Sequence, residues 1–192
     1  MNLVERAKNI VLTPKTEWVT IDGETHTVQG LYTTYVMILA AIPPVATFIG
    51  LAVVGMGPFR FPMVNLLAML VVQYVLGLGM VYVMALIIDA LAPSFGGTKN
   101  FMQAFKVAAF FPTAAWLAGV LYIIPLLGIL GLLAGLYCLY VLYLGLPILM
   151  KSPQDKAIGY VAVIIVIAIV LSIVVSVLTG LVMPGRMMRG GF

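Results

Sequence analysis

The chain has 192 residues, of which 64% are hydrophobic and only 8% are charged. An ordinary soluble domain carries roughly 25% charged residues, so this composition excludes a soluble globular protein, and its apolar content excludes a disordered one. The net charge of +4 comes without a basic run, and we expect it to set membrane orientation rather than to bind nucleic acid.

The first part of the chain, residues 1–30, is the most polar, and we expect it to be a cytoplasmic interfacial segment without a cleavable signal peptide. Leu3, Ala7 and Ile10 recur at helical spacing. This pattern predicts a short amphipathic helix over residues 2–12 that lies on the membrane surface.

The second half of this segment has a different pattern. Residues 19–28 alternate around Asp22-Gly23, which is typical of a small β-hairpin, with a polar linker as the alternative. An isolated hairpin is only marginally stable, so it would have to pack against another element. We expect Trp18, just before it, to lie near the lipid headgroups.

Five apolar stretches follow, each long enough to cross the ~30 Å hydrocarbon core as a helix. Segments of alternating polarity, which a membrane barrel requires, are missing. The sequence therefore predicts an all-α integral membrane protein in which Pro125 alone separates the third and fourth helices. The expected spans are residues 31–55, 64–91, 101–124, 126–150 and 157–183, which together form a transmembrane domain at 31–183, and residues 184–192 are a short tail.

The basic residues near the span ends predict the orientation, since they concentrate on the cytoplasmic side. A cytoplasmic N-terminus places seven of them inside and three outside. We therefore expect a multi-pass protein of the cell (inner) membrane with a cytoplasmic N-terminus and an external C-terminus. The inside residues are Arg6, Lys8, Lys15, Lys99, Lys106, Lys151 and Lys156, and the outside residues are Arg60, Arg186 and Arg189.

Ionisable residues in or beside the apolar spans are the candidates for a functional site. Asp89 is near the cytoplasmic end of the second span and Lys106 is about two turns into the third, so antiparallel helices would bring them within reach. The alternatives are a structural ion pair or snorkelling of both side chains to the interface. The candidate polar cluster comprises Asp89, Lys99, Gln103, Lys106, Tyr143, Lys156 and Tyr160.

One face of the third span carries polar groups at helical spacing and can face a water-filled cavity. Asn100 and Gln103 have the spacing of a capping box at its start. The glycine-containing loop before it, residues 92–99, lacks the spacing and the preceding strand of a phosphate loop, and predicts a turn between helices. The stripe comprises Lys99, Gln103, Lys106, Phe110 and Thr113.

The first span contains Pro43 and Pro44, which remove two backbone donors and leave the carbonyls of Leu39 and Ala40 without helical partners. Such carbonyls bind a cation or water in the broken helices of transporters. The alternative is a simple kink whose oxygens are satisfied by neighbouring groups, with Thr47 as one candidate donor.

Small residues mark two helix faces that permit close packing. Gly131 and Gly135 form a GxxxG pair in the fourth span, and Ser172, Ser176 and Gly180 recur at every fourth position in the fifth. These faces predict either packing within one chain or a homo-oligomer.

The sequence offers little material for catalysis. His26 is the only histidine and lies in the polar N-terminal segment, so a conventional histidine-based triad or a two-histidine metal site has almost no material. Cys138 is the only cysteine, so no disulfide can form within one chain. We therefore expect a protein that is not an enzyme and that holds no cofactor and no metal.

Several runs resemble the Ypt-interacting-protein (Yip) family, in particular its prokaryotic members. The resemblance lies in Ala-Pro-Ser-Phe-Gly-Gly-Thr-Lys at 92–99, in residues 112–116, in Tyr-x-x-Tyr-x-x-Tyr-Leu-Gly-Leu-Pro at 137–147 and in Asp-Lys-Ala-Ile-Gly-Tyr at 155–160. It implies five spans with a cytoplasmic N-terminus. Eukaryotic relatives bind prenylated Rab-type GTPases and shape or sort vesicle membranes, but their Asp-Leu-Tyr-Gly segment is missing here, so the GTPase role is not carried over.

The sequence thus predicts a non-enzymatic, membrane-embedded interaction or membrane-organising module. Its expected partners are the lipid bilayer, a second copy of the chain or an unidentified membrane protein, and not nucleic acid. The alternative is a small transporter or channel for an ion or small solute, using the polar cytoplasmic half around Asp89 and Lys106.

Overall fold

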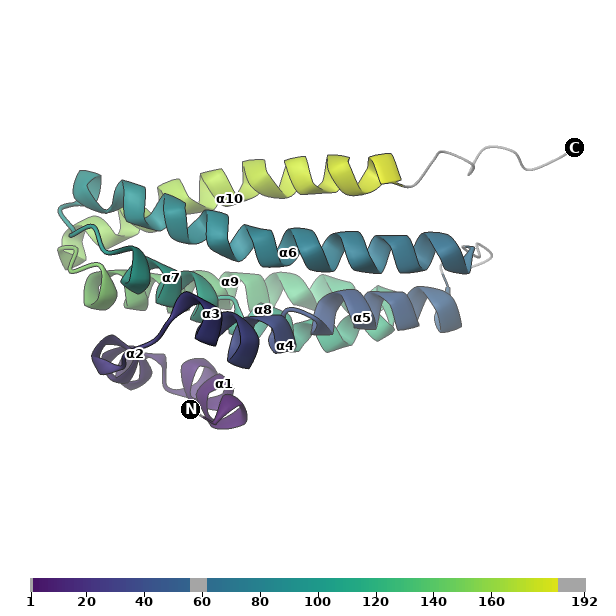
Figure 1. Ribbon diagram of the computed structural model, residues 1–192, viewed down its shortest axis with the longest axis horizontal. Coiled ribbons are helices and arrows are strands. Elements are labelled where there is room, and N and C mark those ends of the chain that lie inside the picture. The colour runs from purple at the N-terminus through teal and green to yellow at the C-terminus, as the bar shows by residue number, and fades with distance from the viewer. Residues whose placement is uncertain (1, 56–61, 183–192) are drawn as a thin grey trace, which may run out of the picture.

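The computed structural model describes residues 2–55 and 62–182, which form a helical bundle without β-strands in these ranges (Figure 1). Five segments are long and apolar enough to cross a membrane, which confirms the predicted fold class. Arg60, Arg186 and Arg189, on which the outside charge count rests, lie outside the described residues, as do Met183 and the tail. The five segments are Val28–Val54, Met63–Phe95, Phe101–Ile123, Leu126–Leu149 and Gln154–Leu178.

Two short helices precede the first span. Helix α1 (Leu3–Leu12) begins at Asn2, whose side chain accepts from the backbone N–H of Val4 at 3.1 Å, and it confirms the predicted N-terminal helix. Helix α2 (Pro14–Gly23) starts with a proline, whose missing N–H costs nothing at that position.

The expected hairpin over 19–28 is not formed, because α2 continues through Gly23 and an extended connector follows. Pro14, Trp18 and Ile21 recur at helical spacing and are all buried. Burial of this helical stripe against α9 (Gly131–Leu149) outweighs the local preference of Asp-Gly for a tight turn.

The first span is a series of short helical pieces rather than one straight helix. The chain turns at Ala40 and Ala41, directly before Pro43 and Pro44, so the expected kink is present. The Thr47 hydroxyl donates to the carbonyl of Pro43 at 2.8 Å, and not to the carbonyls of Leu39 or Ala40. The pieces are α3 (Val28–Leu31), the π-helical turn η1 (Tyr32–Val36), α4 (Met37–Leu39), α5 (Ile42–Ile49) and the π-helical turn η2 (Gly50–Val54).

The second and fifth spans are the two long helices of the bundle. Helix α6 (Met63–Leu91) and helix α10 (Gln154–Val182) each contain 29 residues and pack against each other. Helix α6 passes into the 3₁₀ turn η3 (Ala92–Phe95), which ends at Gly96 in a left-handed conformation that suits a glycine. This confirms the predicted turn between helices.

The third and fourth spans form the tight hairpin expected at Pro125. Helix α7 (Phe101–Phe110) begins at Asn100, whose side chain accepts from the Gln103 N–H at 3.2 Å, as the capping pattern predicts. The chain continues through α8 (Thr113–Ala118) and the 3₁₀ turn η4 (Gly119–Ile123), and returns through the 3₁₀ turn η5 (Pro125–Leu130) into α9.

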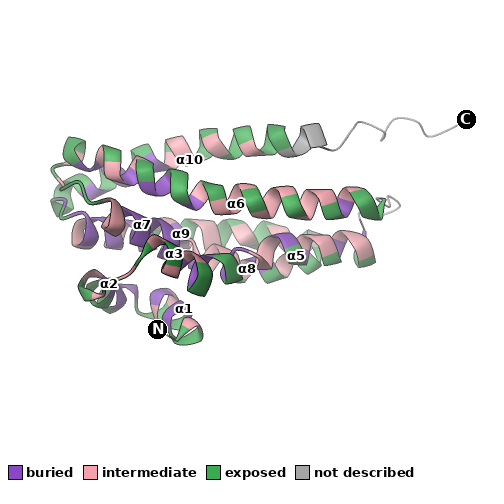
Figure 2. Ribbon diagram, viewed as in Figure 1, coloured by how far each residue is buried: buried purple, intermediate pink, exposed green. Residues whose placement is uncertain are grey.

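Buried residues concentrate at one end of the bundle (Figure 2). We call this the N-terminal end; it is formed by α2, α7, η3 and the turn Met150–Pro153 between α9 and α10. Its core contains large side chains from several elements, whereas the other end exposes apolar side chains along α5, α6, α9 and α10. The core here includes Trp18, Ile21, Leu31, Tyr35, Ile88, Phe105, Phe110, Leu146 and Tyr160.

Candidate functional site

The polar site at the N-terminal end is built around Arg6 on the inner face of α1. Its guanidinium forms ion pairs with Glu17 of α2 and with Glu24, the residue after α2, and its side chain is only 6% exposed. Arg6 is buried on the same helix as Ala7 and Ile10, although it is not one of the apolar residues that predicted this helix. A buried charge requires such partners, because an unpaired one carries a large desolvation penalty.

Lys106 of α7 lies beneath the C-terminal end of α2. Its ammonium donates to the carbonyls of Ile21 at 2.9 Å, Asp22 at 3.4 Å and Glu24 at 2.6 Å, and the residue is 3% exposed. The last carbonyls of a helix lack intrahelical partners and carry partial negative charge. Lys106 therefore caps the C-terminal end of α2, although it lies more than eighty residues away in the chain.

Asp22 connects the same helix end to two further elements. Its carboxylate accepts from the Gln103 side-chain amide at 2.9 Å and pairs with the Lys151 ammonium at 2.6 Å. Lys151 adopts a left-handed backbone conformation, with φ of 55°, in the turn before α10. Asp22 thus ties α2 to α7 and to the α9–α10 turn.

Trp18 anchors α2 in the bundle. Its side chain is completely buried in the protein, and its expected position near the headgroups stays a prediction. Its indole N–H donates to the carbonyl of Val141 at 2.9 Å. Its ring packs on Gly145 so closely that a Cβ there would lie 2.7 Å from the ring.

Phe110 lies at the centre of an aromatic cluster beside Arg6. Its ring centroid is 4.7 Å from that of Tyr35 and 6.5 Å from that of Trp18, both edge-on, and the Arg6 guanidinium lies 5.8 Å from the same centroid. The Tyr35 hydroxyl is 2.8 Å from that of Thr113, further along the polar face of the third span. The predicted polar stripe therefore exists, but Gln103, Lys106, Phe110 and Thr113 contact protein rather than a water-filled cavity.

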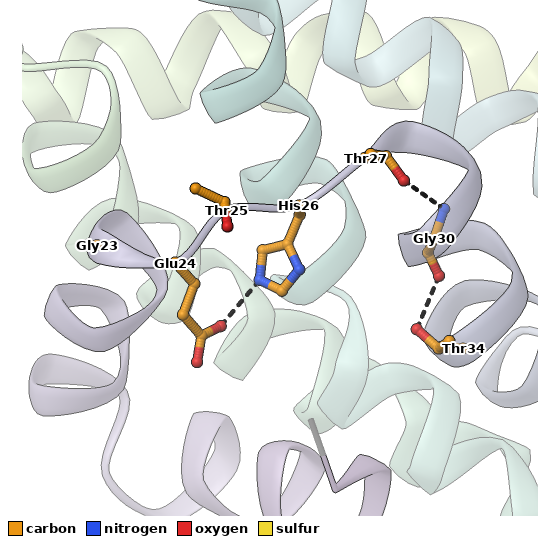
Figure 3. A pocket seen from close by; sticks show the side chains of 7 residues that line it. All are labelled: Gly23, Glu24, Thr25, His26, Thr27, Gly30 and Thr34. Atoms are coloured by element: carbon orange, nitrogen blue, oxygen red, sulfur yellow. Dashed lines mark hydrogen bonds and ion pairs between the residues drawn. The ribbon is translucent and has the colours of Figure 1, made fainter.

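A polar groove of 730 Å³ opens beside this site, along the connector between α2 and α3 (Figure 3). Within it, the His26 ring lies beside Glu24, with Nε2 at 2.8 Å from the carboxylate. Partial burial by itself raises the pKa of Glu24, but hydrogen bonds from His26 and Arg6 outweigh it and hold this pKa below the ordinary 4.5. The groove is lined by Gly23, Glu24, Thr25, His26, Thr27, Gly30 and Thr34.

Asp89 and Lys106, the expected pair, are not joined by an ion pair in the described part of the chain. Lys106 points to α2, and one carboxylate oxygen of Asp89 is buried without a hydrogen-bond partner. Tyr160 lies against this end of α6, where its hydroxyl donates to the Ile88 carbonyl and its ring stacks on Phe95 at 4.8 Å.

The remaining members of the predicted polar cluster lie nearer the surface. Lys99 and Lys156 are exposed. The Tyr143 hydroxyl accepts from the Gln154 side chain at 3.3 Å. The structure therefore divides the predicted cluster: Lys106 and Gln103 contact α2, and the other members do not share that contact.

The small residues of the fourth and fifth spans have different surroundings. A Cβ at Gly131 would lie 2.6 Å from the Tyr122 hydroxyl, so this glycine permits packing within the chain. Gly135 has no such neighbour within 4 Å, and Ser172 and Ser176 are exposed. The backbone of Gly180 lies in α10.

Sequence reasoning missed the acidic partners of Arg6 and the backbone carbonyls that hold Lys106, and it missed Gly145. One signal was available, because Pro14, Trp18 and Ile21 have helical spacing behind a proline that starts a helix well. The contacts across more than eighty residues, from α2 to α7 and α9, had no signal in the local pattern.

Comparison with known proteins agrees with this architecture. Residues 8–176, from α1 to the outer part of α10, match the profile of the Yip1 domain family. None of the curated proteins and none of the solved structures compared with the chain matches it. The match includes all five spans and most of the N-terminal segment, and the chain therefore belongs to the Yip1 domain family.

Proposed function

We propose that this protein is a non-enzymatic, membrane-organising module whose N-terminal end lies at the cytoplasmic face of the cell membrane. The observation that supports the proposal is that the two ends of the bundle differ in structure. At the N-terminal end, α1 and α2 are docked beside the bundle and almost the entire core is found there (Figures 1 and 2). At the other end, the described residues form apolar helices with exposed side chains.

Such a shape occupies unequal areas in the two leaflets. The docking is rigid, because it rests on a buried tryptophan, a buried arginine and a capped helix end. A protein that is broader in one leaflet has a lower free energy where the bilayer curves toward that leaflet. A protein of this shape therefore either gathers in curved membrane or stabilises the curvature.

The chemistry of the site supports this function over transport. The Lys106 ammonium is surrounded by three backbone carbonyls of the N-terminal segment, which leaves little room for a solute. The groove in Figure 3 is lined by neither Lys106 nor Asp89.

A curvature-sorting measurement tests the proposal. In a Cys138→Ser background, Ser94→Cys on the exposed surface of η3 is reacted with a membrane-impermeant dye in giant vesicles, so that only molecules with the N-terminal end outward are labelled. A narrow tube is then pulled from the vesicle. We expect the dye to be severalfold denser in the tube than in the flat membrane, and equal densities would contradict the proposal.

The matched control is Gly145→Leu, which removes the space for Trp18 and so detaches α2 from α9. Gly135→Leu, on the same helix but with no neighbour within 4 Å, controls for the added side chain. Enrichment in the tube should fall in the first variant and persist in the second.

A further inference from the structure

The helices α1 and α2 lie beside the bundle and not beyond its end (Figure 1). The Tyr137 hydroxyl donates to the carbonyl of Val11, at the end of α1, with a distance of 2.6 Å. Tyr137 stands three turns before the end of α9, which is about 18 Å of helix. The C-terminal end of α9 therefore extends well past the level of α1.

The exposed apolar surface of the neighbouring spans ends at this same level. On α9, exposed large apolar side chains extend from Leu130 to Tyr140, and between Val141 and Leu149 no residue is exposed. On the first span they begin at Met37, which is preceded by the exposed Thr33 and Thr34. Because lipid tails require an apolar protein surface, this pattern places the boundary of the hydrocarbon core beside α1 on the side of α9 and the first span.

The outward face of α1 and α2 has the composition of an interfacial surface. Val4 is 70% exposed, Leu12 66% and Val19 62%, although the opposite faces of both helices already bury apolar side chains in the bundle. Lys8 and Lys15 are exposed with them. Apolar side chains mixed with lysines are typical of helices that lie in the headgroup region and attract anionic lipids.

We propose that this outward face, comprising Val4, Lys8, Leu12, Lys15 and Val19, binds the surface of the surrounding bilayer. Val4 and Leu12 enter the boundary between headgroups and acyl chains, and the two lysines contact phosphates of anionic lipids. The occupant is the bilayer rather than a soluble partner, because α1 contacts α9 at the level where the exposed apolar surface of that helix ends. The proposal rests on the proposed function in placing the N-terminal end at one membrane surface, and it adds a lipid preference.

Single cysteines in a Cys138→Ser background test the depth of this face. Spin labels at Val4→Cys and Leu12→Cys are compared with one at Thr20→Cys, because exposed Thr20 lines a polar groove with Glu5 and Asn9. In nanodiscs, the labels at positions 4 and 12 should collide more often with oxygen than with a water-soluble nickel complex, and the label at position 20 should do the reverse. Equal nickel access at all three positions would overturn the proposal.

The lipid preference is tested separately with Lys8→Gln combined with Lys15→Gln. In nanodiscs with rising phosphatidylglycerol content, we expect the wild-type labels at positions 4 and 12 to move deeper, and this shift to be reduced severalfold in the double variant. A matched Lys99→Gln variant, changed at an exposed lysine away from this face, should keep the full shift. An equal shift in all three proteins would overturn the role of the lysines.

The two proposals fail in different ways. A protein that is enriched in the pulled tube while the labels at positions 4 and 12 stay in water would refute the lipid-binding face and leave the shape argument in place. Labels in lipid with no enrichment in the tube would refute the proposed function alone. A soluble protein that covers the face would shield these labels from nickel and from oxygen alike, which also overturns the proposal.

Discussion

Arg6 depends on two carboxylates, one from Glu17 within α2 and one from Glu24 directly after it. Because Arg6 and Glu17 are both buried, removal of Arg6 takes this partner from the Glu17 carboxylate, and removal of Glu17 takes one of its carboxylates from Arg6; such a loss costs up to about 3 to 5 kcal/mol when burial is full. We expect Arg6→Met and Glu17→Gln each to lower the free energy of unfolding in detergent, and the double variant to recover much of that loss. Denaturant titrations followed by Trp18 fluorescence measure this coupling.

A double-mutant cycle on Asp89 and Lys106 serves as the comparison for the Arg6–Glu17 pair. No ion pair joins these two side chains in the described residues, so the effects of Asp89→Asn and Lys106→Met should simply add. Strong coupling between them would show that they pair in the membrane. Lys106→Met alone should destabilise, since it leaves the carbonyls at the end of α2 without a donor.

Glu24 makes the stability of this site depend on acid pH. Its pKa in the folded protein lies below 4.5, so its contribution is fully present above the unfolded value and is lost as pH falls through the folded one. The melting temperature should therefore drop as the pH falls below 4.5, and Glu24→Gln should flatten that part of the profile. Identical profiles for the two proteins would mean that Glu24 does not carry the effect.

The packing of α2 on α9 requires a glycine at position 145. Gly145→Leu forces a side chain into the Trp18 ring, and overpacking of this kind costs about 1 to 3 kcal/mol or more. We expect this variant to melt earlier and to shift the Trp18 emission to longer wavelength, as the indole meets water. Gly135→Leu on the same helix has open space around it and should change neither quantity.

The Gly135 variant also tests self-association, which stays a prediction. Gly131 is used within the chain by Tyr122, so the GxxxG pair does not act as one face. If copies meet through α9, Gly135→Leu should lower the crosslinked fraction in membranes, since a larger side chain prevents close helix approach. An unchanged fraction would place the contact elsewhere.

The orientation of the whole molecule is a further prediction, made from the basic residues of the N-terminal end. Lys99, Lys151 and Lys156 are exposed there, as cytoplasmic lysines are expected to be. Reporter fusions at Lys151 should read cytoplasmic and fusions after Phe192 external. The opposite pattern would reverse the leaflet assigned to α1 and α2, together with the sign of the curvature preference.

Much of the fold could be predicted because membrane insertion depends on local properties. A stretch of about 20 apolar residues must be helical in lipid, where unsatisfied backbone groups are too costly. The five spans, the Asn100 cap and the turn at Pro125 all follow from short windows of sequence. The helix α2 could not be found in this way, because the alternation around Asp22-Gly23 is a local signal and the burial of Trp18 is not.

The candidate site shows the same division. Asp89 and Lys106 were singled out as charges beside apolar runs, and that reasoning found Lys106 but not its partners. Its contacts are backbone carbonyls of α2, which any sequence supplies and which no residue pattern marks.

By itself, the sequence determined that this protein lies in a lipid bilayer, how many spans it has and to which family it belongs. Hydropathy and short motifs are properties of neighbouring residues, so they can be read without the fold. Only the tertiary structure decided that α1 and α2 dock beside the bundle, that Arg6 and Lys106 turn inward, and that one end is broader than the other. Ion pairs and buried rings join residues far apart in the chain, and their free energy depends on geometry that exists only once the helices have packed.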